Sequence, residues 1–244
     1  MIKFTGIIAE YNPFHNGHKH QIEHLRSLGT GVIAVAMSGD FVQRGAPAWT
    51  DKYTRTQMAL SQGADLVFEL PTVYTLSSAE HFAFGGISLL NALHMDSVCF
   101  GCETPSLPLL DSAAELLQKE PDDYRQTLQQ HLKSGASYPA AREAALRQSM
   151  PELPPDFLSG ANNILALEYL KALRSTHSTM TPVPILRTDS GYHSTELSCG
   201  TFSSASAIRF SYKDTDSLND ISHALPEEIM TLLKKRSGHL GMDT

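Results

Sequence analysis

The 244-residue sequence lacks a long apolar run, has few positive charges and contains only three cysteines. No segment approaches the ~20 apolar residues that a membrane-spanning helix needs. The N-terminus carries one lysine, and its apolar stretch is interrupted by Glu10, which is not typical of a signal peptide. We therefore expect a cytoplasmic protein with no membrane partner.

The few cysteines argue against a zinc or redox protein, and the charge balance argues against a general affinity for nucleic acid. Cys99 and Cys102 form one C-x-x-C, and a zinc site would need a second pair. The pair ends an apolar strand, whereas a redox thiol usually starts a helix. We expect neither a metal site nor a redox site. The net charge of −7, from 19 basic and 26 acidic residues, means that contact with a nucleic acid must use a local basic patch.

Strand and helix patterns alternate from residue 4 to residue 100. Such repeats predict right-handed β–α–β units, and hence an α/β fold with a doubly wound parallel sheet. Ligands of such sheets bind at the carboxyl ends of the strands. The expected strands are 4–9, 31–37, 65–70 and 96–100, the helices are 18–28, 51–62 and 77–93, and the loops at the ligand edge are 11–18, 38–47, 71–77 and 101–105.

The pattern changes after residue 105. Three polar-faced helical patterns indicate a helical insertion at 106–150. We divide the chain into an α/β domain (1–105 and 151–211), this insertion, and a helical C-terminal tail (212–244). The expected elements are helices at 107–118, 122–133, 138–148, 162–173, from 203 and at 226–236, and a strand at 182–187.

The first strand is followed by His15-Asn16-Gly17-His18, an H-x-G-H at the start of a helix. A helix N-terminus offers unpaired N–H groups and a partial positive charge. Gly17 allows close backbone approach to a ligand, and the imidazoles can donate hydrogen bonds to phosphate oxygens. The pattern predicts a nucleotide triphosphate site. Two surface histidines around a turn glycine are the alternative interpretation.

A second polar run, residues 201–209, opens a later helix and includes Ser203, Ser204 and Arg209. Serines at such a place are commonly N-caps. Together with the H-x-G-H, they favour a second phosphate-binding helix start, where Arg209 would neutralise departing pyrophosphate. The candidate catalytic residues are therefore His15, His18 and Arg209.

A wider set of segments resembles one family of the nucleotidylyl-transferase superfamily, the tRNA(Met) cytidine acetate ligases. They occur in that family's order and span about residues 1 to 210. The first of them is very specific to the family. The segments are GIIAEYNPFHNGHKHQIE, MSGDFVQRGAPA, DKYTRTQMAL, GADLVFELP, SAEHFAFGGISLL, FGCE, NNILALEYLKAL, ILRTDSGYH and SSASAIR.

The resemblance implies a Rossmann-like nucleotide-binding domain and a two-step ligase. ATP with Mg²⁺ and acetate would give acetyl-adenylate, whose acetyl group would pass to N4 of the wobble cytidine of elongator tRNA(Met). ATP, acetate and tRNA(Met) would be the partners, and no oligomeric state is implied. The implied ATP-binding residues are Ile7, Ile8, Ala9, Glu10, Tyr11, Asn12, Pro13, Phe14, His15, Asn16, Gly17, His18, Lys19, His20, Gly101, Asn162, Asn163, Arg187, Ser203 and Ser204.

One residue departs from the family pattern. Asp40 stands where the family usually has Asn, and a carboxylate beside acetate and phosphates should repel both unless a lysine lies close. Asp40, Gln43 and Arg44 are candidate substrate contacts, and Asp40 leaves the acyl donor open.

Two further points stay open. Either Asn162 or Asn163 could contact ATP, and Asn162 could instead cap a helix. Of the cations Arg44, Lys52 and Arg55, one or two would face the triphosphate or a tRNA backbone, with a solvated helix face as the alternative.

Two other functions fit the same motifs. The chain could be a nucleotidylyltransferase for a small phosphorylated metabolite. It could also be an ATP-binding remnant without tRNA acetylation, because it is shorter than typical family members.

Overall fold

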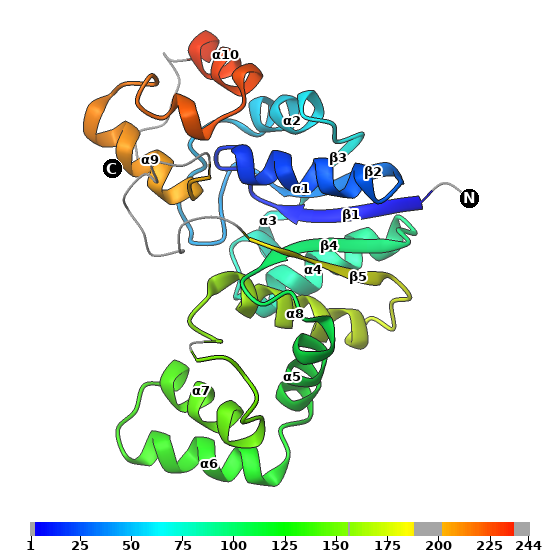
Figure 1. Cartoon of the computed structure of the whole chain (residues 1–244), viewed down its shortest axis with the longest axis vertical. Coiled ribbons are helices and arrows are strands. Elements are labelled where there is room, and N and C mark those ends of the chain that lie inside the picture. Colours follow the sequence, from blue (N-terminus) through cyan, green and yellow to red (C-terminus); the bar gives the residue numbers. More distant parts are fainter. Residues whose placement is uncertain (1–2, 156, 188–201, 237–244) are drawn as a thin grey trace.

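A five-stranded parallel sheet forms the centre of the computed structural model, which describes residues 3–155, 157–187 and 202–236 (Figure 1). The strand order is β3-β2-β1-β4-β5, and every pairing is parallel. The order reverses at β1, the kind of position where open α/β sheets bind ligands. The predicted α/β class is confirmed. The strands are β1 (Lys3–Ala9), β2 (Thr30–Ser38), β3 (Leu66–Leu70), β4 (Ser97–Cys102) and β5 (Thr181–Leu186).

Helices cover both faces of the sheet, because successive strand residues point to opposite sides. Ile33 and Val35 pack toward α1, α2 and α10, whereas Ala34 and Ala36 pack toward α4, α5 and α8. The helices are α1 (Asn16–Ser27), α2 (Lys52–Ser61), α3 (Thr72–Thr75), α4 (Ala79–Ala92), α5 (Leu107–Lys119), α6 (Asp122–Lys133), α7 (Tyr138–Ser149), α8 (Ala161–Ser175), α9 (Ala205–Thr215) and α10 (Glu227–Arg236), with the 3₁₀ turn η1 (Ser222–Ala224).

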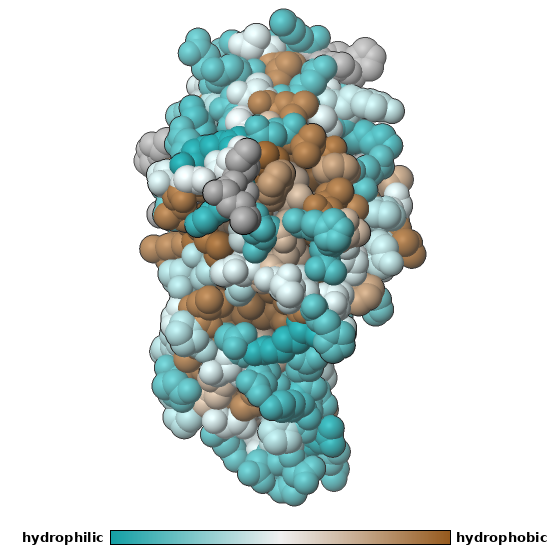
Figure 2. Space-filling model, turned by 90° about the vertical axis from the view of Figure 1, so that its right-hand side faces the viewer, coloured by the Kyte–Doolittle hydropathy of each residue, from teal (hydrophilic) through white to brown (hydrophobic). Residues whose placement is uncertain are grey.

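The predicted insertion forms an extension at one end of the molecule. Helices α6 and α7 pack on each other below α5 (Figure 1), and their end of the molecule is mostly hydrophilic in Figure 2. Helix α5 packs against α8 and so belongs to the layer that covers the sheet. The domain boundaries stay a prediction. Within the described ranges, no helix combines the length and hydropathy needed to cross a membrane.

Two local features differ from the expectation. Helix α1 begins at Asn16, so His18 lies within its first turn and His15 becomes its N-cap. The expected loop 71–77 contains α3, a helix of a single turn. So short a helix has no apolar period that a sequence pattern could reveal.

Candidate active site

A cavity of about 240 Å³ opens at the carboxyl ends of β1, β4 and β5. The start of α1, the loop 38–50, α4, α8 and the start of α9 complete its wall. It lies at the sheet edge where the sequence places the ligand site. The predicted site residues that line it are Ile8, Ala9, Glu10, Tyr11, Asn12, His15, Gly17, His18, His20, Gln43, Arg44, Gly101, Asn162, Arg187, Ser204 and Arg209.

The two histidines of the H-x-G-H are oriented by backbone N–H groups. His15 Nδ1 accepts a hydrogen bond from Gly17 N at 3.1 Å, and His18 Nδ1 accepts one from His15 N at 3.2 Å. The rings stack with their centroids 3.6 Å apart. Because an accepting nitrogen bears no proton, each neutral ring carries its proton on Nε2. The Nε2–H groups are therefore the donors that these rings can offer to a phosphate oxygen.

The environment of His18 keeps its ring neutral. Burial lowers its pKa well below the usual value, and the neighbouring His15 and Arg187 lower it further. A neutral donor polarises a phosphate oxygen through its N–H dipole, and no buried positive charge has to be formed at this position. The cationic charge at the site comes from the arginines instead.

Helix α9 begins at the cavity and contributes an arginine. Ser204 is its N-cap and accepts a hydrogen bond from Ala207 N at 3.1 Å. Arg209 donates to Ser206 Oγ at 3.4 Å and to the carbonyl oxygen of Asn12, which joins α9 to the end of β1. Ser203 is fully buried and does not line the cavity, whereas Ser206 does. The structure thus brings Ser204 and Arg209 to the H-x-G-H, but not Ser203.

Arg187 lies across the end of β4 and is held by a polar chain. It donates to Asn162 Oδ1 at 2.8 Å, and Asn162 Nδ2 donates to Glu103 Oε1 at 2.7 Å. A Cβ atom on Gly101 would lie 2.9 Å from Arg187 Cγ, closer than side-chain atoms normally approach. Gly101 is one of the implied ATP-binding residues, and the structure shows that a side chain at this position would first meet Arg187.

The structure separates the two asparagines at the start of α8. Asn163 is buried, and its Oδ1 accepts hydrogen bonds from the Glu103 and Thr104 N atoms at 3.1 Å. It fixes the turn after β4 and does not line the cavity, whereas Asn162 does. The N-cap of α8 is Gly160, so the interpretation of Asn162 as an N-cap is wrong.

Several residues of the 7–20 block lie outside the cavity wall. Neighbouring residues of a strand face opposite sides, so a contiguous block cannot all face one ligand. Ile7 and Phe14 are in the core, Asn16 donates to the His223 carbonyl at 2.9 Å, and Lys19 pairs with Glu23 at 3.9 Å. The predicted ATP-binding residues that do not line the cavity are Ile7, Pro13, Phe14, Asn16, Lys19, Asn163 and Ser203.

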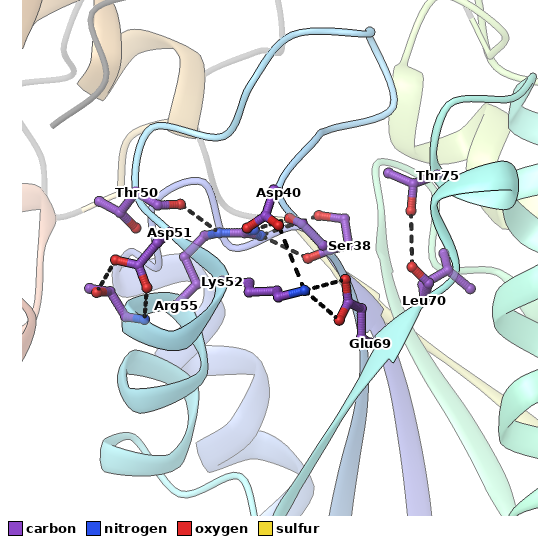
Figure 3. Close-up of polar contacts among 11 residues, drawn as sticks. Ser38, Asp40, Thr50, Asp51, Lys52, Arg55, Glu69, Leu70 and Thr75 are labelled. Carbon is purple, nitrogen blue, oxygen red and sulfur yellow. Dashed lines mark hydrogen bonds and ion pairs between the residues drawn. The ribbon is translucent and has the colours of Figure 1, made fainter. Parts of the chain in front are cut away.

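Asp40 lies away from the cavity and is paired with a lysine (Figure 3). Its carboxylate is 3.6 Å from Lys52 Nζ, which also binds Glu69 at 2.9 Å. Asp40 does not line the cavity, so the expectation that it faces the acetate and the phosphates stays a prediction that this geometry does not favour. The lysine that could offset its charge is present.

Arg55 is buried beneath the loop 38–50 and does not face a ligand. Its guanidinium donates to the carbonyl oxygens of Ser38 at 3.0 Å and Thr50 at 3.2 Å (Figure 3). It also donates to those of Glu10 at 2.7 Å and Gly39. Of the three cations that the sequence offered for the triphosphate or a tRNA backbone, Arg55 is therefore not available. Arg55 joins the ends of β1 and β2 to the loop that follows β2.

The loop 38–50 is held against β1 by two side chains. Glu10 Oε1 accepts a hydrogen bond from Gln43 N at 2.8 Å, and Asn12 Oδ1 accepts one from Trp49 N at 2.7 Å. These contacts place Val42, Gln43 and Arg44 in the cavity wall. Two of the three candidate substrate contacts, Gln43 and Arg44, therefore lie at the cavity.

The sequence analysis did not select the apolar part of the wall. Phe82, Phe100, Leu165 and Tyr169 belong to α4, β4 and α8, where their spacing is that of ordinary core residues. Among the lining residues that were missed, only Ala205 and Ser206 lie in the polar run 201–209 that the sequence pattern singled out. The missed lining residues are Gln21, Val42, Phe82, Phe100, Leu165, Tyr169, Ile185, Leu186, Ala205 and Ser206.

The cysteines of the C-x-x-C are buried in β4. Burial raises the pKa of the Cys99 and Cys102 thiols to about 12, which disfavours the reactive thiolate. In the part of the chain that the structure describes, no group of three or more His, Cys, Asp or Glu side chains could hold a metal ion.

Comparison with known proteins supports the resemblance found in the sequence. A tRNA(Met) cytidine acetate ligase of Clostridium kluyveri is 46% identical over 97% of this chain and 60% of its own length. That of Acetivibrio thermocellus is 44% identical over 90% of this chain and 54% of its own length. The chain thus spans little more than half of the curated relatives that it matches.

Solved structures agree with the fold. Apo Thermotoga maritima TmcAL superimposes with a TM-score of 0.89 at 35% identity, over 97% of this chain and 57% of that one. The same protein bound with alpha-thio ATP gives a TM-score of 0.84 at 34% identity, over 97% of this chain and 56% of that one. The profile of the HIGH Nucleotidyl Transferase family matches residues 2–242. The chain belongs to the HIGH nucleotidyl transferase family.

Proposed function

We propose that this chain activates acetate with ATP to give acetyl-adenylate and pyrophosphate, and transfers the acetyl group to N4 of the wobble cytidine of elongator tRNA(Met) in the cytoplasm. The observation that carries the proposal is the cavity whose wall brings both histidines of the H-x-G-H together with Arg187 and Arg209. The similarity to curated ligases and to a structure bound with alpha-thio ATP supports it.

The first step is an in-line attack by the acetate carboxylate on the α-phosphate of ATP. The bond between the α-phosphorus and the bridging oxygen breaks, and pyrophosphate leaves with the electron pair. His15 and His18 donate from Nε2 to phosphate oxygens on which charge increases, and Arg209 neutralises the pyrophosphate. Because their partners are fixed before ATP enters, these donors need little reorganisation during the reaction.

Mg²⁺ is expected to enter with ATP. Mg²⁺ commonly keeps several waters and binds substrate phosphates with one or two carboxylates. The described wall contains a single carboxylate, so the phosphates and water would hold the ion. The ion would add positive charge beside the phosphates.

The experiment is pyrophosphate exchange into ATP, combined with a search for acetylcytidine in tRNA(Met). Acetate-dependent exchange and acetylcytidine are the expected results. Exchange that requires a phosphorylated metabolite instead would indicate a small-molecule nucleotidylyltransferase. Calorimetry that detects no ATP binding would contradict the proposal altogether.

A further inference from the structure

Among the described residues that line the cavity, Glu10 is the only one with a carboxylate. A negative charge is unexpected in a cavity proposed to hold ATP and acetate, because it repels both. Its Oε1 accepts the hydrogen bond from Gln43 N at 2.8 Å, whereas Oε2 has no hydrogen-bond donor among the described residues. Supporting the loop 38–50 thus uses one of the two oxygens.

The carboxylate lies beside the apolar part of the cavity wall. Glu10 and Tyr169 of α8 line the same cavity, and burial together with the Glu10 charge raises the pKa of Tyr169 well above its usual value. Phe82, Phe100 and Leu165 line the same cavity. An apolar wall beside a carboxylate suits a flat, uncharged ring that carries an amino group.

Acetyl transfer to cytidine requires a proton acceptor. The N4 lone pair is delocalised into the cytosine ring, so the amine is a weak nucleophile and must lose a proton as it is acylated. The N4–C bond forms, the C–O bond to AMP breaks, and AMP leaves with the electron pair. A positioned base that removes the N4 proton contributes typically 10²–10⁴-fold to such a step.

The other ionisable groups of the cavity are poor acceptors. His15 and His18 use Nδ1 for backbone N–H groups and carry their proton on Nε2, so they donate there. Burial raises the pKa of the Tyr11 and Tyr169 hydroxyls, which keeps both protonated. His20 is the remaining alternative, and its exposed ring lies at the cavity rim, 5.8 Å from the ring of Phe202.

We propose that Glu10 is the general base that takes the N4 proton during acetyl transfer. The inference rests on the proposed function and assigns Glu10 to its second step. Glu10 accepts the proton at Oε2 while Gln43 N holds Oε1.

Glu10→Gln tests the proposal, because the amide oxygen can still accept from Gln43 N while the side chain can no longer take a proton. Two acceptors should be compared on the same preparation: hydroxylamine, a strong nucleophile that needs no base, and cytidine, supplied in tRNA(Met) and as the nucleoside at high concentration. We expect acetylcytidine formation to fall about 100-fold or more relative to acetohydroxamate formation. Glu10→Asp should recover part of the loss.

Matched variants identify the cause of a loss. Glu23→Gln makes the same chemical change on the exposed face of α1 and should alter neither product. Equal losses of both products in Glu10→Gln would show a role in ATP binding or loop support and would overturn the proposal. The proposal would also be overturned if acetylcytidine formation were lost selectively in His20→Gln and not in Glu10→Gln.

The unmutated chain separates this proposal from the proposed function. Acetohydroxamate without any acetylcytidine would leave adenylation intact and overturn the assignment of Glu10. The absence of both products would overturn the proposed function, and the assignment with it.

Discussion

At the residue scale, each histidine of the H-x-G-H has one ring nitrogen, Nδ1, bound to a backbone N–H group. The backbone N–H groups of His15 and Gly17 occupy Nδ1, so the first turn of α1 fixes which nitrogen bears the proton. The motif spacing follows from this arrangement. The N-cap residue and the third residue after it are those whose side chains reach backbone N–H groups at a helix start.

His18→Ala should slow acetate-dependent pyrophosphate exchange about 10²–10³-fold, the usual effect of losing one preorganised donor, or about 2.7–4 kcal/mol. His131→Ala, in α6 of the insertion, removes an imidazole away from the cavity and is the control. A loss of less than about threefold in His18→Ala would show that its Nε2–H does not act on the transition state.

The lowered pKa of His18 predicts how stability depends on pH. The unfolded chain binds a proton at this ring near its ordinary pKa of about 6.5, whereas the folded chain resists protonation until lower pH. The neutral His18 ring therefore makes its full contribution to the free energy of unfolding above the unfolded pKa. That contribution is lost as the pH falls toward the folded pKa. Urea unfolding at pH 7.5 and pH 5.5 should show lower stability at pH 5.5. The decrease should be smaller in His18→Ala than in His131→Ala.

Asp40→Asn should change acetate-dependent exchange less than about twofold. The side chain lies outside the cavity and is paired with Lys52, and exposed pairs are worth about 0–1 kcal/mol. If the carboxylate repelled acetate and phosphates, as the sequence analysis expected, the substitution would instead raise the exchange rate. A clear rise in the exchange rate would show that Asp40 reaches the substrates when they bind.

At the scale of elements, the site depends on how two strand ends are joined. Arg55 of α2 donates to carbonyl oxygens at the end of β1, at the end of β2 and in the loop 38–50. Glu10 and Asn12 hold that loop from the side of β1. One buried guanidinium and two side chains thus shape the wall that contains Gln43 and Arg44.

Arg55→Met should lower the free energy of unfolding by about 3 kcal/mol or more. It leaves buried carbonyl oxygens without donors, and each such loss costs about 1–3 kcal/mol. Arg147→Met, on the exposed face of α7, is the control and should stay within about 0.5 kcal/mol. Urea unfolding measures both. A small effect at Arg55 would mean that water replaces the guanidinium.

The elements that the sequence predicted are those with a clear apolar period. The strands and most of the helices follow from alternating and helical spacing, and their order gives the parallel sheet. Spacing could not separate Asn162 from Asn163, because the difference depends on how α8 is rotated against Glu103. It could not reveal Arg55 as buried either, since two of the three segments that supply its acceptors are distant in the sequence. Phe82 and Tyr169 were missed because cavity-lining and core residues share one pattern.

At the scale of the whole molecule, the residues to which we assign adenylation come from distant parts of the described chain. The H-x-G-H, Arg187 and Arg209 line one cavity. Acetyl transfer also requires that a large polyanion be held. The chain has 19 basic residues against 26 acidic ones.

Adenylation by this chain should therefore be more efficient than tRNA acetylation. Binding of tRNA depends mainly on lysine and arginine contacts to phosphates, and a net charge of −7 provides no general attraction. The same preparation should be assayed for acetate-dependent exchange and for acetylcytidine in tRNA(Met), at low salt and at physiological salt. Exchange should hardly change with salt, whereas acetylcytidine formation should fall steeply, because bound counterions are released when phosphates are neutralised. Robust acetylation with micromolar tRNA affinity at physiological salt would contradict the charge argument and would indicate a local basic groove.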